Sequence, residues 1–203
     1  MTQSTPAGNG EAVQEIIVGV LLPISSDYAA GGEESKAAIE VAAGDINDYF
    51  TSIGSDYRVR VILEDTRTDP AVALEKLEAL DEQGVKIVIG PGSSAELEAA
   101  RTYADEHGII LISTMSTAPS LAIAGDNVYR FVPPDTYQAG AMAYYLRADG
   151  ITAVVPIWRG DIWGDELKIL AAESFARGNA TVLDGVRYEP GETDYTGMVA
   201  DLD

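Results

Sequence analysis

Glycine and hydroxyl residues follow two short apolar stretches within the segment that runs from Lys86 to Pro119. The first cluster is Gly90–Ser94 and the second is Ser113–Thr117. Ligands of an open parallel sheet lie outside the carboxyl ends of its strands, where backbone N–H groups and hydroxyls can bind a small polar molecule. The two clusters therefore predict a binding rim at one edge of a sheet.

The first cluster joins a predicted buried strand to a helix that begins near Ala95. Free backbone N–H groups at that helix N-terminus, together with the hydroxyls of Ser93 and Ser94, form an anion site, because the helix end carries partial positive charge. A carboxylate could replace water there without needing an arginine. The alternative is that Ser93 or Ser94 only caps the helix.

The second cluster follows the next strand and is predicted at the same edge of the sheet. Here the backbone carbonyl near Met115 and the hydroxyl of Thr117 can accept hydrogen bonds from an ammonium group, with Ser116 between them. Together the two clusters could hold the carboxylate and the ammonium of an amino acid. A simple Ser/Thr turn that ends at Pro119 is the alternative.

Two tryptophans near a later strand could form the opposite wall of such a site. The segment Ile157–Leu167 follows a predicted strand and opens a helix, and it contains Trp158 and Trp163. An aromatic wall facing a polar rim on another lobe is the design of a clamp. Trp158 could equally belong to the core, whereas Trp163 beside Gly164 in a polar loop is harder to explain by packing.

The residues that enzymes most often use are scarce in this chain. It has one histidine, His107, and no cysteine, which makes a soft-metal cluster or a Cys/His nucleophilic pair impossible. His107 is predicted at a helix end, where a cation favours the helix dipole and Gly108 forms the C-cap. Carboxylate pairs such as Glu33 and Glu34 are typical of a solvated face in an acidic chain. We therefore expect no enzyme activity, no cofactor and no metal site.

The order of the elements brings the two clusters to one edge. Strands alternate with helices along the chain, which predicts right-handed crossovers and an α/β fold with doubly wound parallel sheets. The predicted strands are Ile16–Ile24, Tyr57–Leu63, Lys86–Ile89, Ile109–Ser113, Val128–Val132, Thr152–Trp158 and Ala180–Tyr188. The predicted helices are Glu33–Phe50, Pro70–Gln83, Ser94–His107, Tyr137–Ala148, Asp161–Arg177 and one that starts at Thr193.

The chain is expected to divide into two lobes. Residues 16–134 form lobe one, and the Pro-Pro-Asp sequence at Pro133–Asp135 marks its end. Residues 135–203 form a second lobe that is too short for an independent core, so a longer protein or a partner chain would complete it. Its unpaired strand edges favour self-association. Residues 1–15 are small, polar and aperiodic, which predicts either a flexible tether after a removed signal or lipid anchor, or a frayed terminus.

The charge of the chain limits its partners. It has 33 acidic and 13 basic residues in 203, a net charge of −20, which argues against nucleic acid or anionic membrane as a partner. Only four of the basic residues are lysines, a balance that indicates either adaptation to high salt or a very soluble surface. No apolar run reaches the length of about 20 residues that a membrane span needs.

Six motifs in sequence order resemble the type I solute-binding proteins of ABC importers, specifically the leucine/isoleucine/valine-binding family. The resemblance covers about residues 16–203 and implies a type I periplasmic-binding-protein fold with two lobes. The motifs are IIVGVLLPISSDYAAGGEESKAAIEVAAGDIN, IVIGPGSS, GIILISTMSTAP, YRFVPPD, WGDEL and YEPGETDY. STMSTAP departs from the family pattern because Met115 stands at a usually small position.

The resemblance implies roles for individual residues of lobe one. Ser94 matches a serine that binds the ligand carboxylate, Met115 a residue whose backbone meets the ligand, and Thr117 a threonine that contacts carboxylate or ammonium. Gly31 stands where the first loop often has an aromatic residue, which leaves Tyr28 to fill that part of the pocket.

For lobe two, the resemblance matches Trp163 to an aromatic that covers the ligand and Asp135 to an aspartate near the cleft. The remaining lobe-two ligands of the family, an aromatic and an acidic residue, would lie beyond Asp203. It follows that we expect an extracytoplasmic protein that captures an aliphatic amino acid for an ABC permease. The alternative is the extracellular ligand-sensing domain of a receptor or of an amide or urea sensor.

Overall fold

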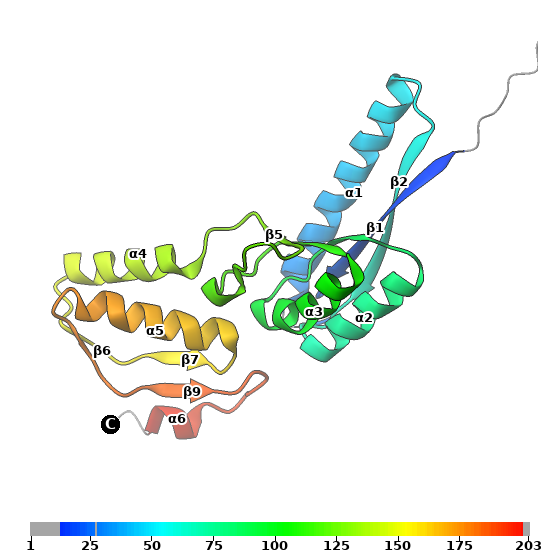
Figure 1. The fold of residues 1–203 in the computed structure, drawn as a ribbon. Helices are drawn as coiled ribbons and strands as arrows, with labels where there is room; N and C mark the ends of the chain where they lie inside the picture. The colour runs from blue at the N-terminus through cyan, green and yellow to red at the C-terminus, as the bar shows by residue number, and fades with distance from the viewer. Residues whose placement is uncertain (1–12, 27, 201–203) are drawn as a thin grey trace, which may run out of the picture.

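Two groups of α/β elements lie side by side in the computed structural model of the chain, which describes residues 13–26 and 28–200 (Figure 1). Lobe one comprises β1–β5, α1–α3 and the short 3₁₀ helix Pro119–Leu121, and lobe two comprises α4–α6 and β6–β9. Of the tether expected at residues 1–15, residues 1–12 lie outside the described residues, whereas Gln14 and Glu15 belong to a strand and not to a tether. The strand β1 begins at Gln14, two residues before the predicted start, because Gln14 and Glu15 pair with Tyr57 and Arg58 of β2.

Lobe one is built on a five-stranded parallel sheet in the order β2-β1-β3-β4-β5. Chain order reverses on either side of β1, and this arrangement confirms the predicted doubly wound α/β fold. The strands are β1 (Gln14–Leu22), β2 (Tyr57–Asp65), β3 (Ile87–Ile89), β4 (Ile110–Ser113) and β5 (Val128–Arg130). The helices are α1 (Ala29–Ser52), α2 (Pro70–Glu82) and α3 (Ser94–His107).

The core of lobe one joins α2 and α3 to the central strands. Leu21 of β1, Leu77 of α2, Leu97 of α3 and Leu111 of β4 are fully buried in one cluster. Burial of such a side chain contributes roughly 1.5–3 kcal/mol. This cluster fixes α3 against the sheet, so the N-terminus of α3 stands at the carboxyl end of β3.

Helix α1 starts four residues earlier than the sequence predicts, because the loop before it is shorter. Gly32, in its first turn, packs so closely on the carbonyl oxygen of Pro23 that a Cβ atom would overlap it. Only Gly32 of this helix is buried, whereas Val41 and Ile46 are exposed. The apolar positions at helical spacing therefore predict the helix correctly but not its burial.

Lobe two holds a smaller core, where α4 and α5 pack on each other through Ala139, Ala143, Ala171 and Phe175. Two predicted strands are each divided in two, the first at Pro156, which has no N–H to donate, and the second at residues 183–185, which lie outside any strand. The helices are α4 (Asp135–Ala148), α5 (Ile162–Ala176) and α6 (Thr196–Ala200). The strands β6 (Ala153–Val154) and β7 (Ile157–Arg159) pair in parallel with β8 (Thr181–Val182) and β9 (Val186–Tyr188) respectively.

Candidate functional site

A cavity of about 280 Å³ lies between the two lobes and is lined by residues of both. Lobe one supplies the ends of β1 and β2, the residue before α1, the N-terminus of α3 and the loop after β4. Lobe two supplies α4, the end of β7 and the start of α5. The lining residues are Pro23, Tyr28, Thr68, Ser93, Ser94, Glu96, Met115, Thr117, Gln138, Arg159 and Trp163. Six of the eight predicted site residues are among them, and Ser116 and Asp135 are not.

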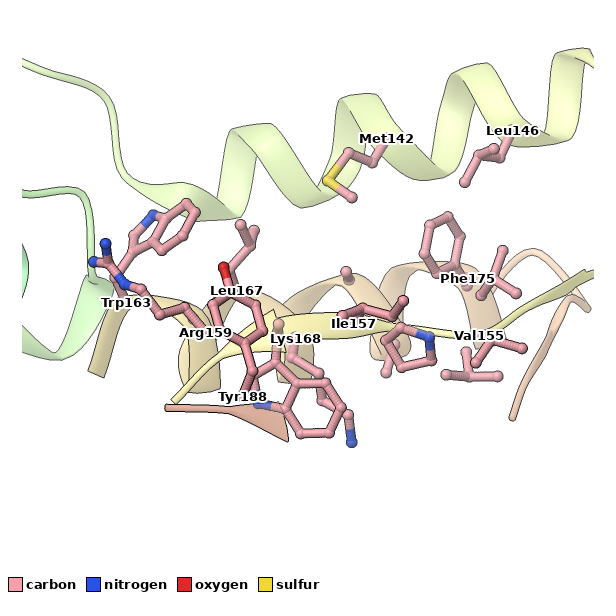
Figure 2. Close-up of a pocket in the computed structure, with 17 residues that line it drawn as sticks. Met142, Leu146, Val155, Ile157, Arg159, Trp163, Leu167, Lys168, Phe175 and Tyr188 are labelled. Carbon is pink, nitrogen blue, oxygen red and sulfur yellow. The ribbon is translucent and has the colours of Figure 1, made fainter. Parts of the chain in front are cut away.

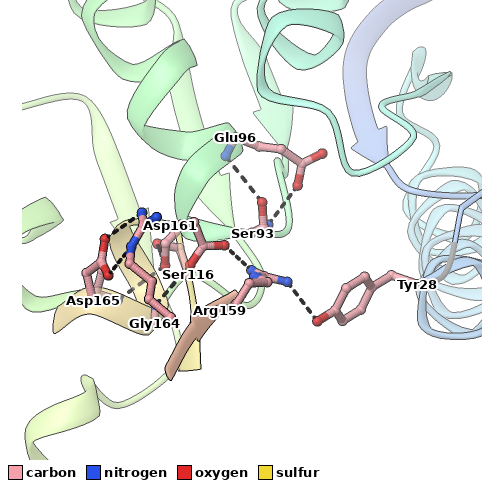
Figure 3. A network of polar contacts seen from close by, with 11 residues as sticks. Tyr28, Ser93, Glu96, Ser116, Arg159, Asp161, Gly164 and Asp165 are labelled. Atoms are coloured by element: carbon pink, nitrogen blue, oxygen red, sulfur yellow. Dashed lines mark hydrogen bonds and ion pairs between the residues drawn. The ribbon is translucent and has the colours of Figure 1, made fainter. Parts of the chain in front are cut away.

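Ser93 lines the cavity, and its hydroxyl caps α3. The Ser93 hydroxyl accepts a hydrogen bond from the Glu96 amide at 3.2 Å, and the Glu96 carboxylate accepts one from the Ser93 amide at 2.9 Å (Figure 3). This capping box occupies the amides of Ser93 and Glu96 and leaves those of Ser94 and Ala95 without an intrahelical partner. The capping alternative therefore holds for Ser93.

Ser94 is buried at the cavity wall and is held by the second cluster. Its hydroxyl oxygen accepts hydrogen bonds from the Ser116 hydroxyl at 3.1 Å and from the Ala118 amide at 3.3 Å. A hydroxyl oxygen has two lone pairs and one proton, so Ser94 retains only its proton for a further bond. Ser116 is fully buried and orients Ser94 from behind. The Ser94 hydroxyl therefore offers the cavity a donor.

Met115 and Thr117 extend the rim on the loop after β4. Met115 is 43% exposed and reaches over Gly92, where a Cβ atom would stand 3.0 Å from the methionine methyl group. Thr117 is half-buried, and its backbone carbonyl accepts the Asp135 amide at 3.0 Å. That bond joins the lobe-one rim to the first turn of α4.

Asp135 lies behind Thr117 and is 1% exposed. Burial raises the pKa of Asp135 above its usual range and Glu166 adds to this, whereas groups on Thr117 and Trp163 and the charge of Arg130 lower it in part. Neither carboxylate oxygen has a partner in hydrogen-bond geometry within residues 13–26 and 28–200. Asp135 is thus a buried, incompletely paired carboxylate at the connection between the lobes.

Arg159 is the residue that the sequence analysis missed, together with Thr68, Glu96 and Gln138. It ends β7, and its side chain is 15% exposed. One terminal nitrogen donates to the Tyr28 hydroxyl at 3.0 Å and the other pairs with Asp161 (Figure 3). The guanidinium carbon lies 5.8 Å from the ring centre of Tyr28 and 5.3 Å from that of Trp163. Arg159 therefore bridges aromatic residues of the two lobes.

Asp161 pairs with the guanidinium of Arg159. Burial by itself would lower the pKa of Arg159, but Asp161 and Tyr28 together outweigh it and raise that pKa above its usual value. Asp161 also caps α5 by accepting the Gly164 amide at 2.9 Å. Gly164 packs on the Arg159 carbonyl so closely that a Cβ atom would overlap it. The start of α5 and the end of β7 therefore form one tightly packed corner.

Thr68 reaches the cavity from an unusual backbone conformation. Arg67 and Thr68 have φ angles of 55° and 58°, and the Thr68 hydroxyl lies 2.6 Å from that of Ser26. Asp65 supports the turn by accepting the amides of Ile24 and Arg67, each at 3.0 Å. Burial opposes ionisation of Asp65, yet its hydrogen bonds from Ser25 and these amides lower its pKa overall. No local pattern signals a left-handed pair without glycine.

Comparison with known protein families identifies the family to which the chain belongs. The family described as periplasmic binding protein matches residues 15–203. The chain belongs to this family of solute-binding proteins, which bind their ligands without converting them. The match confirms the resemblance seen in the sequence, and the matched family is one of binding proteins and not of enzymes.

Three curated relatives match nearly the whole chain. An uncharacterised protein of Methanocaldococcus jannaschii is 33% identical over 98% of this chain and 48% of its own length. A chemotactic signal transduction system substrate-binding protein of Halobacterium salinarum is 32% identical over 94% and 48%. The Leu/Ile/Val-binding protein of Escherichia coli K12 is 26% identical over 96% and 53%. The chain thus spans about half the length of the curated relatives it matches.

Solved structures show the same fold with different ligands in their descriptions. A leucine-binding protein of Thermotoga maritima aligns with a TM-score of 0.79 at 24% identity, over 92% of this chain and 53% of that one. A solute-binding protein of R. palustris in complex with 4-hydroxybenzoate aligns with a TM-score of 0.81 at 17% identity, over 93% and 51%. At these identities the matches show the type I binding-protein fold alone.

A second cavity, of about 370 Å³, lies within lobe two and is mostly apolar (Figure 2). Met142 and Leu146 of α4 point into it from one side, and Ile157 and Phe175 line it from β7 and α5. Trp158 belongs to this part of the protein, and its indole N–H donates to Asp165 at 2.9 Å. Trp158 lines this second cavity and not the one between the lobes, whereas Trp163 lines both.

The remaining predictions on chemistry concern metals and membranes. Within the described ranges, no group of three or more histidine and acidic side chains could hold a metal ion. His107 stacks on Tyr103 with ring centres 3.8 Å apart, and Gly108 forms the left-handed C-cap of α3 as expected. None of the helices in the part of the chain that the structure describes is both long and apolar enough to cross a membrane.

Proposed function

We propose that the protein captures a small amino acid between its two lobes outside the cytoplasm and delivers it to an ABC permease. The observation that carries this proposal is the Ser94 hydroxyl, whose lone pairs are both occupied and whose proton is left for an acceptor in the cavity. Together with the amides of Ser94 and Ala95, it offers a carboxylate several donors at a helix N-terminus.

The predicted class of ligand is an aliphatic amino acid, and the named relatives support it. The relative from Escherichia coli is named for leucine, isoleucine and valine, and the fold also holds leucine in a solved structure. The fold alone does not choose the ligand, since hydroxybenzoate complexes share it. Support for an amino acid therefore comes from the donors at Ser94 and from the oxygen acceptors of Thr117.

Sensing is the second candidate function, and one observation favours it. The relative from Halobacterium salinarum is a substrate-binding protein of a chemotactic signalling system, at 32% identity. A binding lobe can serve transport or signalling with the same cavity, because the output depends on what the closed form contacts. The protein's membrane partner separates the two: co-purification with a permease supports transport, and with a transducer supports sensing.

Isothermal titration of the purified chain with single amino acids tests the binding function. Ser94→Ala should weaken binding roughly 10- to 100-fold, because a hydrogen bond to a charged group is lost. Ser120→Ala, at an exposed serine that does not line the cavity, is the matched control and should bind as the parent does. Equal affinity in Ser94→Ala and Ser120→Ala would contradict the assigned role of Ser94, and no binding of any amino acid by the parent would contradict the function.

A further inference from the structure

Arg159 places a cation in the wall of the cavity. The ligands that the family resemblance implies are aliphatic amino acids, whose side chains are uncharged. A guanidinium has five N–H donors, and the contacts within the described residues use two, one to Tyr28 and one to Asp161. Its Nε is buried and has no partner in that part of the chain. The side chain is 15% exposed, so water can still reach part of it before a ligand binds.

A purely aliphatic ligand would fit this wall poorly. When the lobes close on a ligand, the water at the remaining N–H groups of Arg159 leaves, and a hydrocarbon side chain offers no acceptor in exchange. Each buried donor left unpaired weakens binding by roughly 5- to 150-fold. A ligand with an oxygen acceptor at this position avoids that loss.

The contact with Tyr28 shows how a ligand could engage Arg159. The Tyr28 hydroxyl is a neutral acceptor from lobe one, and Tyr28 is 48% exposed. A carboxylate forms shorter and stronger bonds to a guanidinium than a neutral hydroxyl does, often two in parallel. A ligand carboxylate could therefore displace the Tyr28 hydroxyl while the Asp161 pair keeps the guanidinium in place.

Both walls of the cavity thus offer hydrogen-bond donors to the ligand, and the Glu96 carboxylate on lobe one can accept from a ligand ammonium. On lobe one, the Ser94 hydroxyl and the free amides of α3 can donate to one acceptor of the ligand. On lobe two, Arg159 can donate to a second acceptor of the ligand. We infer that the solute is an acidic amino acid, whose α-carboxylate binds at Ser94 and whose side-chain carboxylate binds Arg159. The inference rests on the proposed amino acid-binding function and replaces the predicted aliphatic ligand class with an acidic one.

Titration calorimetry with L-glutamate and L-leucine, which differ chiefly in side-chain charge, tests this assignment. The parent chain should bind glutamate at least 10-fold more tightly than leucine. Arg159→Gln should reduce glutamate affinity by 30-fold or more and should not weaken leucine binding, because it also removes donors that leucine leaves unpaired; the preference for glutamate is then lost. Arg159→Lys, which keeps the charge without the two-pronged geometry, should retain part of it.

Arg187→Gln is the matched control. Arg187 is also a lobe-two arginine paired with an aspartate, Asp165, but it lies on β9, does not line the cavity, and its side chain is 41% exposed. The substitution makes the same change in net charge and should leave the preference for glutamate intact. Thermal unfolding of each variant verifies that it is folded before titration.

The outcomes separate the inference from the function on which it rests. Tighter binding of leucine than of glutamate by the parent, or an unchanged ratio in Arg159→Gln, would overturn the acidic ligand and leave the amino acid-binding function standing. Absence of binding to both amino acids and to the other standard amino acids would overturn the function, and the inference with it.

Discussion

The buried carboxylate of Asp135 should make the stability of the protein depend on pH in a predictable direction. Because the pKa of Asp135 is raised in the folded state, the folded protein holds its proton to higher pH than the unfolded chain does. Stability from this group is therefore full below the ordinary pKa of an aspartate, 3.8, and is lost as pH rises through the raised value. Ionised Asp135 should oppose folding at neutral pH.

The size of the effect follows from the surroundings of Asp135. A buried acceptor without a partner costs roughly 1–3 kcal/mol, and more when charged. Its place in the first turn of α4 returns about 0.3–1 kcal/mol through the helix dipole. We therefore expect ionisation of Asp135 to cost about 1–2 kcal/mol of unfolding free energy, or about 2–8 °C in Tm for a chain of this length.

Urea denaturation of the parent and Asp135→Asn across pH 3.5 to 7.5 measures this effect. The difference between the two isolates Asp135 from the other acidic residues, and it should shift in favour of Asn by about 1–2 kcal/mol as pH rises. Asp165→Asn is the control with the opposite sign, because a hydrogen bond from Arg187 lowers the pKa of Asp165. A pH-independent difference for Asp135→Asn, or one that shifts in favour of the parent at high pH, would refute the reasoning.

Two further substitutions test the packing around the cavity. Gly164→Ala should destabilise the fold by about 1–3 kcal/mol in thermal or urea unfolding, because its Cβ would overlap the Arg159 carbonyl. Gly140→Ala, on α4 with open space around it, is the control and should stabilise the fold by about 0.5–1 kcal/mol. Equal effects of the two substitutions would show that the backbone at Arg159 and Gly164 can move apart to accept the added methyl group. Ser93→Ala should cost about 1 kcal/mol of stability through loss of the α3 cap but weaken ligand binding less than Ser94→Ala does; the reverse order in calorimetry would transfer the donor role to Ser93.

Most of the fold could be predicted because local signals agreed with the tertiary structure. β3, β4 and α3 lie within one or two residues of their predicted ends, since a short apolar run, a Gly/Ser loop and a capped amphipathic helix each specify the same unit. The division of the two strands at Pro156 and before Gly185 was missed. Apolar and β-branched residues stand on both sides of each break, so each segment looks like one continuous strand until its pairing with neighbouring strands is known. The exposure of α1 was not predicted, because the spacing of apolar residues shows which side of a helix is apolar but not whether another element covers that side.

The candidate site was predictable on lobe one and only in part on lobe two. Ser93, Ser94, Met115 and Thr117 were found by the rule that places loops at the carboxyl ends of parallel strands. Arg159 was missed because its role depends on Tyr28, which lies 131 residues earlier in the chain. An arginine after a strand carries no local sign of the aromatic ring that the other lobe brings to it.

The contact between Arg159 and Tyr28 also bears on how the ligand could act on the lobes. Within the described residues, two more hydrogen bonds join the lobes, one of 3.2 Å from the Ser120 amide to Glu166 and one of 3.0 Å from the Asp135 amide to the Thr117 carbonyl. Each such contact contributes about 1 kcal/mol. A ligand can shift the balance between closed and open forms only through its differential contacts with the two. A ligand that replaces Tyr28 at Arg159 while it also binds Ser94 exchanges a weak contact between the lobes for a stronger one through itself, and so drives closure with the same groups that recognise it.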